Sequence, residues 1–175
     1  MREYKQSTIE VIITGGTIDS YYEGAKDTAV PLKLSSIPLF FKLIKPEDNV
    51  FFKKVCMKDS RQLNGNDLKK IREVINKSKS KLFIVTHGTY TMPDTARFLA
   101  TNLKRKDCTV ILTGSMIPLT GFAPSDAPFN LGYSFAMVKT LKPGIYVCMN
   151  GRIFDPMEVA KRISAGKFVS VLGEN

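Results

Sequence analysis

Four apolar residues in a row at 82–85 (Leu-Phe-Ile-Val) give way abruptly to the polar sequence Thr-His-Gly-Thr-Tyr-Thr at 86–91. Such a β-favouring run is typical of a strand buried on both faces of a parallel sheet. Beyond it, Thr91 is expected to cap a helix, with Asp94 as the second half of a capping box. The pattern predicts a central strand, a tight turn and a helix whose apolar stripe is Ala96, Phe98, Leu99 and Leu103.

The rest of the chain alternates between the same two patterns. Apolar runs predict strands at 8–14, 50–57, 109–113 and 144–149, a short strand at 152–154 and an edge strand at 168–172. Helical periodicity predicts helices at 37–44, 66–77 and 127–140, and 158–163 is expected to be helical or turn-like. This alternation predicts an α/β fold with a doubly wound, mostly parallel sheet flanked by helices. A length of 175 residues fits one domain, residues 1–175.

Glycines and hydroxyl groups follow two of the predicted strands, at the end where open α/β sheets bind ligands. The strand at 8–14 runs into Gly-Gly at 15–16 and then Thr17, and the central strand runs into the segment 86–91. Glycine lets the backbone approach a ligand closely, because it has no Cβ. The glycine spacing matches neither a dinucleotide fingerprint nor a P-loop. We therefore expect Thr17 and Thr89 to face one crevice.

The polar segment 19–33 is expected to be a loop over the end of the first strand, which is a usual position for a lid. It contains Tyr21 and Tyr22, which are either part of that lid or ordinary surface tyrosines. Ser36 is expected to cap the helix at 37–44, since Ser is a favoured N-cap residue.

Charge and composition narrow the class of protein. The chain has 26 Lys and Arg against 16 Asp and Glu, a formal net charge of +10, which is typical of many nucleic-acid-binding proteins. The lysines are scattered and accompany no nucleic-acid motif, so a solvated basic surface without a nucleic-acid partner is predicted. The three cysteines lack the spacing of metal ligands and indicate reduced thiols in the cytoplasm. We expect no metal, no signal peptide and no membrane-spanning segment.

Four motifs together resemble those of bacterial-type L-asparaginases. Two are Thr-Gly-Gly-Thr-Ile at 14–18 and Thr-His-Gly-Thr-Tyr-Thr-Met at 86–92, and the others are Leu-Thr-Gly-Ser-Met-Ile-Pro at 112–118 and Ser-Asp-Ala-Pro-Phe-Asn-Leu at 125–131. The resemblance implies an amidohydrolase that converts L-asparagine, or L-glutamine, to the acid and ammonia without a cofactor. It implies a homodimer or higher homo-oligomer. The chain is expected to hold the family's amino-terminal domain only, with the family's C-terminal domain absent.

The resemblance also implies a role for each matching residue. Thr17 is implied as the nucleophile that forms an acyl-enzyme, and Thr89 with Lys161 as a hydroxyl–lysine relay. Tyr21, or Tyr22 in its place, is implied as the tyrosine that closes over the site. Backbone amides at the turn around Thr89 are expected to stabilise the oxyanion. The residues implied in substrate binding are Gly16, Asp59, Ser60, Gly88, Tyr90 and Ser115.

Tyr90 is the main departure from the family's pattern, which has an aspartate there that holds the substrate's α-amino group. Asp19 and Asp59 are the candidates to supply a carboxylate instead. Arg61 either assists in binding a carboxylate or faces solvent. His87, the only histidine, is expected to be structural and not the base of a Ser-His-Asp triad. The alternative function is a catalytically weak or inactive domain that binds an amino acid or a protein partner.

Overall fold

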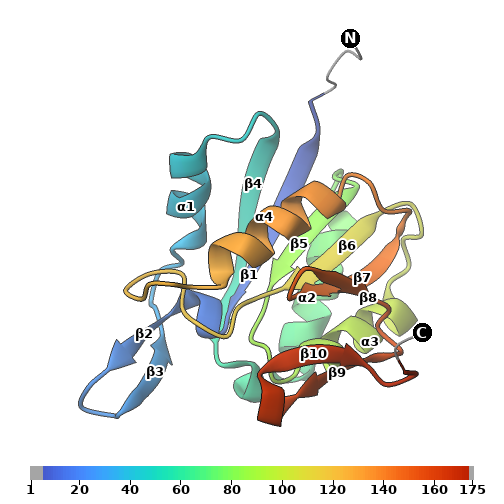
Figure 1. Cartoon of the computed structure of the whole chain (residues 1–175). Coiled ribbons are helices and arrows are strands. Elements are labelled where there is room, and N and C mark those ends of the chain that lie inside the picture. Colours follow the sequence, from blue (N-terminus) through green and yellow to red (C-terminus); the bar gives the residue numbers. More distant parts are fainter. Residues whose placement is uncertain (1–5, 174–175) are drawn as a thin grey trace.

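The computed structural model describes residues 6–173, which form a central six-stranded sheet between two layers of helices (Figure 1). An antiparallel strand, β8 (Arg152–Phe154), forms one edge of the sheet. The structure confirms the predicted doubly wound, mostly parallel α/β fold. Its parallel strands lie in the order β4 (Asn49–Lys58), β1 (Thr8–Gly15), β5 (Leu82–Thr86), β6 (Thr109–Thr113) and β7 (Gly144–Met149).

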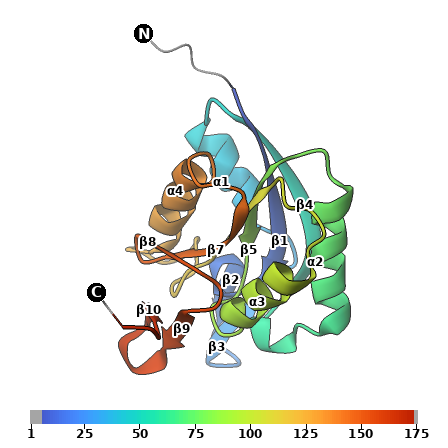
Figure 2. The same cartoon turned by 90° about the vertical axis from the view of Figure 1, so that its right-hand side faces the viewer.

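Each face of the sheet carries its own apolar core and its own pair of helices (Figure 2). Ile84 and Val85, adjacent in β5, belong to opposite cores and are both fully buried. Burial on both faces explains why the central strands are continuous apolar runs instead of alternating ones. The helices are α2 (Gly65–Lys77) and α3 (Met92–Asn102) on one face, and α1 (Ile37–Ile44) and α4 (Ala127–Met137) on the other.

The order of the strands creates a crevice at the carboxyl ends of β1 and β5. β1 lies between β4 and β5, and the connections after β1 and after β4 pass over opposite faces of the sheet, through α1 and α2. Open α/β sheets bind their ligands where the strand order reverses in this way. The turns that follow β1, β4 and β5 therefore meet at the position where the sequence placed its polar motifs.

The segment 19–33 forms a hairpin, so the prediction of a loop was wrong. Its strands are β2 (Ser20–Glu23) and β3 (Thr28–Pro31), which pair antiparallel and project away from the main sheet (Figure 1). Tyr21 and Tyr22 are 41% and 52% exposed. A hairpin with both faces near solvent needs no apolar alternation, which is why the pattern did not reveal it.

The segment around Lys161 also differs from the prediction. Lys161 lies on a strand, β9 (Val159–Arg162), and not on a helix or turn. β9 pairs antiparallel with β10 (Lys167–Ser170) in a separate two-stranded sheet, so β10 is not an edge strand of the main sheet. With four residues in each strand, this hairpin is too short for its alternation to be recognised.

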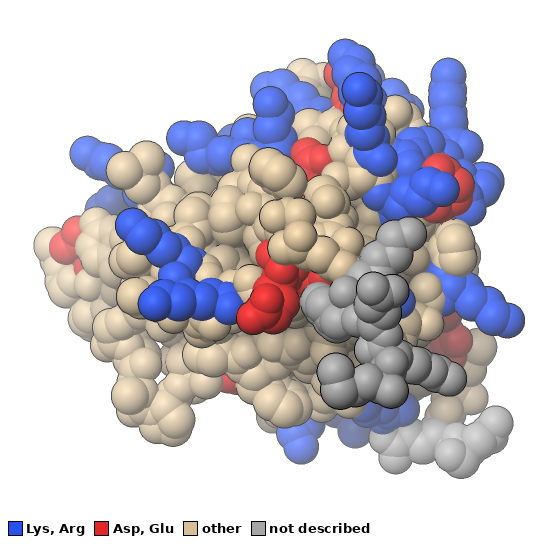
Figure 3. Space-filling model, turned by 90° about the horizontal axis from the view of Figure 1, so that it is seen from above, with Lys and Arg blue, Asp and Glu red and all other residues tan. Residues whose placement is uncertain are grey.

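On the face of the molecule seen from above, basic side chains are spread out and do not form one stripe (Figure 3). Figure 3 shows the molecule from above, where Lys and Arg project from many parts of the face and acidic side chains form small groups. Exposed ion pairs such as Lys81 with Asp107, at 3.9 Å, contribute little to stability. No helix within residues 6–173 is long and apolar enough to cross a membrane.

Candidate functional site

A cleft of about 190 Å³ opens at the carboxyl ends of β1 and β5. Pockets for drug-sized ligands span roughly 300–1,000 Å³, so this cleft suits a smaller molecule. A larger hollow of about 430 Å³ between β4 and α2 lacks a comparable group of hydroxyls. Eight of the ten predicted site residues line the cleft, together with Arg61: Gly16, Thr17, Asp59, Ser60, Gly88, Thr89, Tyr90 and Lys161.

Gly16 brings the two signature motifs into backbone contact. Its φ of 84° favours glycine, and a Cβ there would lie 2.3 Å from the backbone nitrogen of Gly88. Its N–H donates to the carbonyl of Lys58 at 2.8 Å, and its carbonyl accepts the Ser20 hydroxyl at 2.8 Å. The glycine therefore lets the turn after β1 pack directly on the turn after β5, and Thr17 and Thr89 line the same cleft.

Replacing Gly16 with alanine should destabilise the protein by roughly 2–5 kcal/mol, because strain at positive φ and overpacking against backbone add together. Gly121→Ala is a matched control, since Gly121 has a similar φ of 81° but open space where its Cβ would be. Urea unfolding of both variants measures the difference. Equal losses of stability would show that the contact with Gly88 is unimportant.

Thr17 presents an unpaired hydroxyl to the cleft. It begins the short 3-10 helix η1 (Thr17–Asp19) and its side chain is half-buried. Within residues 6–173 its hydroxyl makes no hydrogen bond, so it is free to approach a ligand. The backbone N–H groups of Gly88 and Thr89, both buried, also donate to no acceptor in the described part of the chain. Two unpaired donors on residues that line the same cleft as a free hydroxyl are the kinds of group that attack on an amide carbonyl needs.

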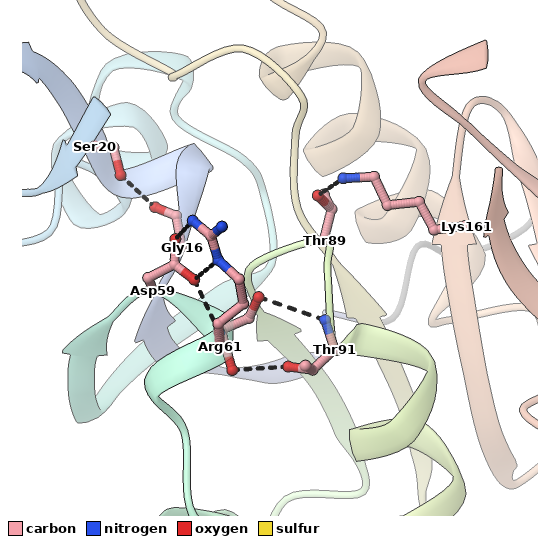
Figure 4. Close-up of polar contacts among 8 residues, drawn as sticks. Gly16, Ser20, Asp59, Arg61, Thr89, Thr91 and Lys161 are labelled. Atoms are coloured by element: carbon pink, nitrogen blue, oxygen red, sulfur yellow. Dashed lines mark hydrogen bonds and ion pairs between the residues drawn. The ribbon is translucent and has the colours of Figure 1, made fainter. Parts of the chain in front are cut away.

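Lys161 is hydrogen-bonded to Thr89. Its Nζ donates to Thr89 Oγ1 at 2.6 Å, across 72 residues of sequence, and Figure 4 shows it reaching Thr89 from the side of β9. Partial burial lowers the pKa of the Lys161 ammonium, and the positive charge of Arg61 lowers it further. A lysine that deprotonates more readily than usual can take up a proton through the Thr89 hydroxyl.

Thr91 joins the turns after β4 and β5. Its hydroxyl donates to the carbonyl of Ser60 at 2.9 Å, and its N–H approaches Ser60 Oγ at 3.4 Å. The predicted N-cap hydrogen bond and capping box are therefore wrong, because Thr91 makes no side-chain cap. Asp94 instead pairs with Arg97 at 3.1 Å.

Asp59 and Arg61 form a close ion pair at the mouth of the cleft. Arg61 donates Nε and Nη2 to the two Asp59 oxygens, each at 3.0 Å, and its backbone N–H donates to Oδ1 at 2.8 Å (Figure 4). These hydrogen bonds lower the pKa of Asp59. The guanidinium also lies 5.8 Å from the ring centre of Tyr90, which is 55% exposed.

His87 is buried behind the cleft and does not line it. Its Nδ1 lies 2.7 Å from the carbonyl of Gly88, and its Nε2 lies 3.0 Å from the Thr95 hydroxyl. These contacts fit a neutral imidazole that donates from Nδ1 and accepts at Nε2. Burial lowers the pKa of His87 to about 4. This placement agrees with the predicted structural role.

His87 should make the protein sensitive to mild acid. Its folded pKa of about 4 lies below its ordinary 6.5, so between these values the unfolded state binds the extra proton and stability falls as the pH falls. We expect the free energy of unfolding to drop by roughly 2–3 kcal/mol between pH 7 and 4.5 on this account. Urea unfolding at both pH values should show a smaller drop for His87→Gln. An equal drop in the wild type and in His87→Gln would show that groups other than His87 cause the acid sensitivity.

Tyr21 and Tyr22 are not brought to the cleft. The Tyr21 hydroxyl donates to Glu23 at 3.0 Å, and the Tyr22 hydroxyl donates to Asp27. Neither tyrosine lines the cleft, so closure of Tyr21 over the site stays a prediction that requires the hairpin to move.

Ser115 and Asp19 are also occupied elsewhere. Ser115 is buried and its hydroxyl donates to the carbonyl of Ile117 at 2.5 Å, outside the cleft lining. Asp19 is fully buried and accepts hydrogen bonds from Ser35 and Ser36. Asp19 therefore cannot supply the carboxylate that Tyr90 lacks, and Ser36 is not the predicted side-chain cap of α1.

The sequence analysis missed the contribution of Lys58. Its carbonyl holds Gly16, and its ammonium forms an ion pair with the nearly buried Asp67 at 2.7 Å. Any residue can offer a carbonyl, so no signal marked Lys58. Asp67 completes a capping box with Asn64. The three-residue spacing of Asn64 and Asp67 was the one available clue to the position of Asp67, which holds Lys58.

The chain is similar to known proteins over most of its length. The family model "Asparaginase, N-terminal" matches residues 8–168. L-asparaginase 2 of Escherichia coli (strain K12) is 31% identical over an alignment of 162 residues, and the match covers 87% of this chain and 46% of that protein. The thermostable L-asparaginase from Thermococcus kodakarensis has a TM-score of 0.80 at 27% identity, covering 94% of this chain and 51% of that one. A probable cytoplasmic L-asparaginase from Campylobacter jejuni has a TM-score of 0.81 at 27% identity, covering 94% and 53%. The chain thus spans about half the length of these relatives.

Proposed function

The chain belongs to the asparaginase family, and from this membership we propose that it hydrolyses the side-chain amide of L-asparagine to L-aspartate and ammonia. Thr17 is the proposed nucleophile, and the reaction passes through an acyl-enzyme. The observation that carries the proposal is the 2.6 Å hydrogen bond from Lys161 to Thr89 in the cleft that Thr17 also lines. A lysine with a lowered pKa on a buried hydroxyl is an arrangement expected of a proton relay.

The proposed reaction has two halves. In the first, Thr17 Oγ attacks the amide carbon and its proton passes to the departing nitrogen, so that ammonia leaves and an ester to Thr17 remains. In the second, water attacks the ester, Thr17 regains its proton and the carboxylate product is released. The N–H groups of Gly88 and Thr89 stabilise the oxyanion in both halves. Neutral Lys161 accepts a proton through Thr89 Oγ1 and returns it within each half.

A second candidate function is a binding domain with little or no catalysis. The observation that favours it is the side chain at position 90, where a phenol lies beside the Arg61 guanidinium that already engages the Asp59 carboxylate. Such a domain binds the substrate or product without turning it over.

Ammonia release from L-asparagine and L-glutamine tests the choice between the two. The proposal expects ammonia from asparagine at a rate proportional to protein concentration, and less from glutamine in a cleft this small. A Thr17→Ala preparation made in parallel controls for host amidases. Binding of L-aspartate without any ammonia release above that control supports the binding domain.

Assembly and location remain predictions. A homo-oligomer is proposed, and α1 carries Leu39 and Leu43 at 57% and 70% exposure on its outer side. Apolar side chains grouped on a surface are typical of protein interfaces. The cytoplasm is the proposed location.

A further inference from the structure

The cleft contains an unusual balance of charge for a site that takes an amino acid. Its charged lining residues are Asp59, Arg61 and Lys161, so cations outnumber the single carboxylate. A zwitterionic amino acid brings an ammonium as well as a carboxylate. An ammonium needs a free carboxylate or several free carbonyl oxygens to replace its hydration shell.

Asp59 does not offer a free carboxylate. Both of its oxygens accept hydrogen bonds from Arg61, which makes three such bonds at 2.8–3.0 Å. Figure 4 shows the guanidinium lying directly against this carboxylate. A ligand ammonium at Asp59 would have to share it with a guanidinium, and two cations at one carboxylate repel each other.

In the part of the chain that the structure describes, no second carboxylate completes the lining. Asp19 is buried and held by Ser35 and Ser36. Asp94 lines a neighbouring hollow beside Tyr90 and Lys161, where its side chain is 71% exposed and pairs with Arg97. An ammonium in the cleft therefore meets the Arg61 guanidinium, and Lys161 as well while that amine is protonated, but no unengaged anion among the described lining residues.

The same groups suit a ligand carboxylate. Arg61 Nη1 makes no hydrogen bond within residues 6–173, and Lys161 uses one donor on Thr89 and keeps others. Charge-assisted hydrogen bonds from such donors are among the stronger polar contacts in proteins. The net charge of +10 adds a field that attracts anions from a distance.

We propose that this cleft selects anionic monoamides that carry a carboxylate but no free α-ammonium, the class represented by succinamate, over zwitterionic asparagine. The proposal rests on the proposed amidohydrolase function and names its substrate class. Tyr90 is the specificity-determining residue, because it lines the cleft beside the Arg61 guanidinium and brings a phenol there instead of a free carboxylate.

Succinate and L-aspartate, the products of the two amides, differ only by the amino group and test the proposal without catalysis. Calorimetric titration of the wild-type chain should show succinate binding at least about tenfold tighter, the loss expected when one charge-assisted contact is replaced by repulsion. Tyr90→Asp should shift the ratio of the two affinities toward aspartate by about tenfold or more. Tyr90→Asn introduces a side chain of the same size as aspartate but without its charge. This variant should leave the ratio of the two affinities near the wild-type value.

Aspartate binding as tightly as succinate to the wild type, or no binding of either, would overturn the proposal. Equal shifts for Tyr90→Asp and Tyr90→Asn would also overturn it, since size and not charge would then decide. The preference should appear in KM more than in kcat when succinamate and asparagine are compared as substrates. Selective binding of succinate with no hydrolysis of either amide would refute the proposed amidohydrolase function and support the anionic ligand class. Hydrolysis with a preference for asparagine would support the amidohydrolase function and refute the anionic ligand class.

Discussion

Thr17→Ala should lower the rate of ammonia release by a factor on the order of 10³ or more, because no acyl-enzyme can form without the hydroxyl. Thr17 is half-buried in a short 3-10 helix and its hydroxyl makes no hydrogen bond within residues 6–173. Removing Oγ therefore breaks no contact that supports the fold. We expect the unfolding midpoint and the affinity for product to stay close to those of the wild type. Kinetics of ammonia release and urea unfolding measure the two effects separately.

Thr17→Ser is the matched control for the nucleophile. It keeps the hydroxyl but loses the methyl group that restricts its rotamer, so a loss of roughly tenfold is expected. Activity in Thr17→Ala as high as in the wild type would exclude Thr17 as the nucleophile and direct attention to Thr89.

Lys161→Met should lower the same rate by roughly 10²–10⁴, the usual contribution of general acid–base catalysis. The proposed relay needs the neutral amine. Lys161 has a pKa lowered from 10.5, so the wild-type rate should rise with pH as the amine loses its proton and level off above that lowered pKa. Kinetics of Lys161→Met across the alkaline range should show that this rise is lost.

Lys161→Arg tests whether Lys161 acts as a base or only through its positive charge. Arginine keeps the cation and a donor for Thr89 but does not deprotonate in proteins. If Lys161 is the base, the arginine variant should be as impaired as Lys161→Met. An arginine variant near wild-type activity would show that Lys161 only positions Thr89 by its charge.

The strands and the first two motifs of the site were predictable because burial determines them. β5 and β6 are buried on both faces, and an apolar run of that length allows few other structures. The turns after β1 and β5 carry glycines whose positions are dictated by backbone contact, as between Gly16 and Gly88. Local pattern was therefore sufficient to place Thr17 and Thr89 in one crevice.

Contacts between segments far apart in sequence were not predictable from pattern. Lys161 reaches Thr89 across 72 residues from a short hairpin, and only the family resemblance singled it out. Thr91 has the residue type of an N-cap, but its hydroxyl is used by the Ser60 carbonyl instead. In each case a tertiary hydrogen bond overrides a local preference.

The exposed charges were the least predictable part of the site. Nothing in the sequence shows that Arg61 folds back on Asp59, since an exposed arginine has many rotamers of similar energy. That pairing determines whether the cleft has a free carboxylate, and so it carries the substrate preference proposed above.

The central claim, that an acyl group passes through Thr17, is tested most directly by trapping. Hydroxylamine captures an acyl-enzyme as a hydroxamate, in competition with water. During turnover of asparagine or succinamate, we expect hydroxamate to increase with hydroxylamine concentration and the acid-quenched peptide containing Thr17 to carry one acyl group by mass spectrometry. Ammonia release with neither a hydroxamate nor an acylated Thr17 peptide would contradict the account.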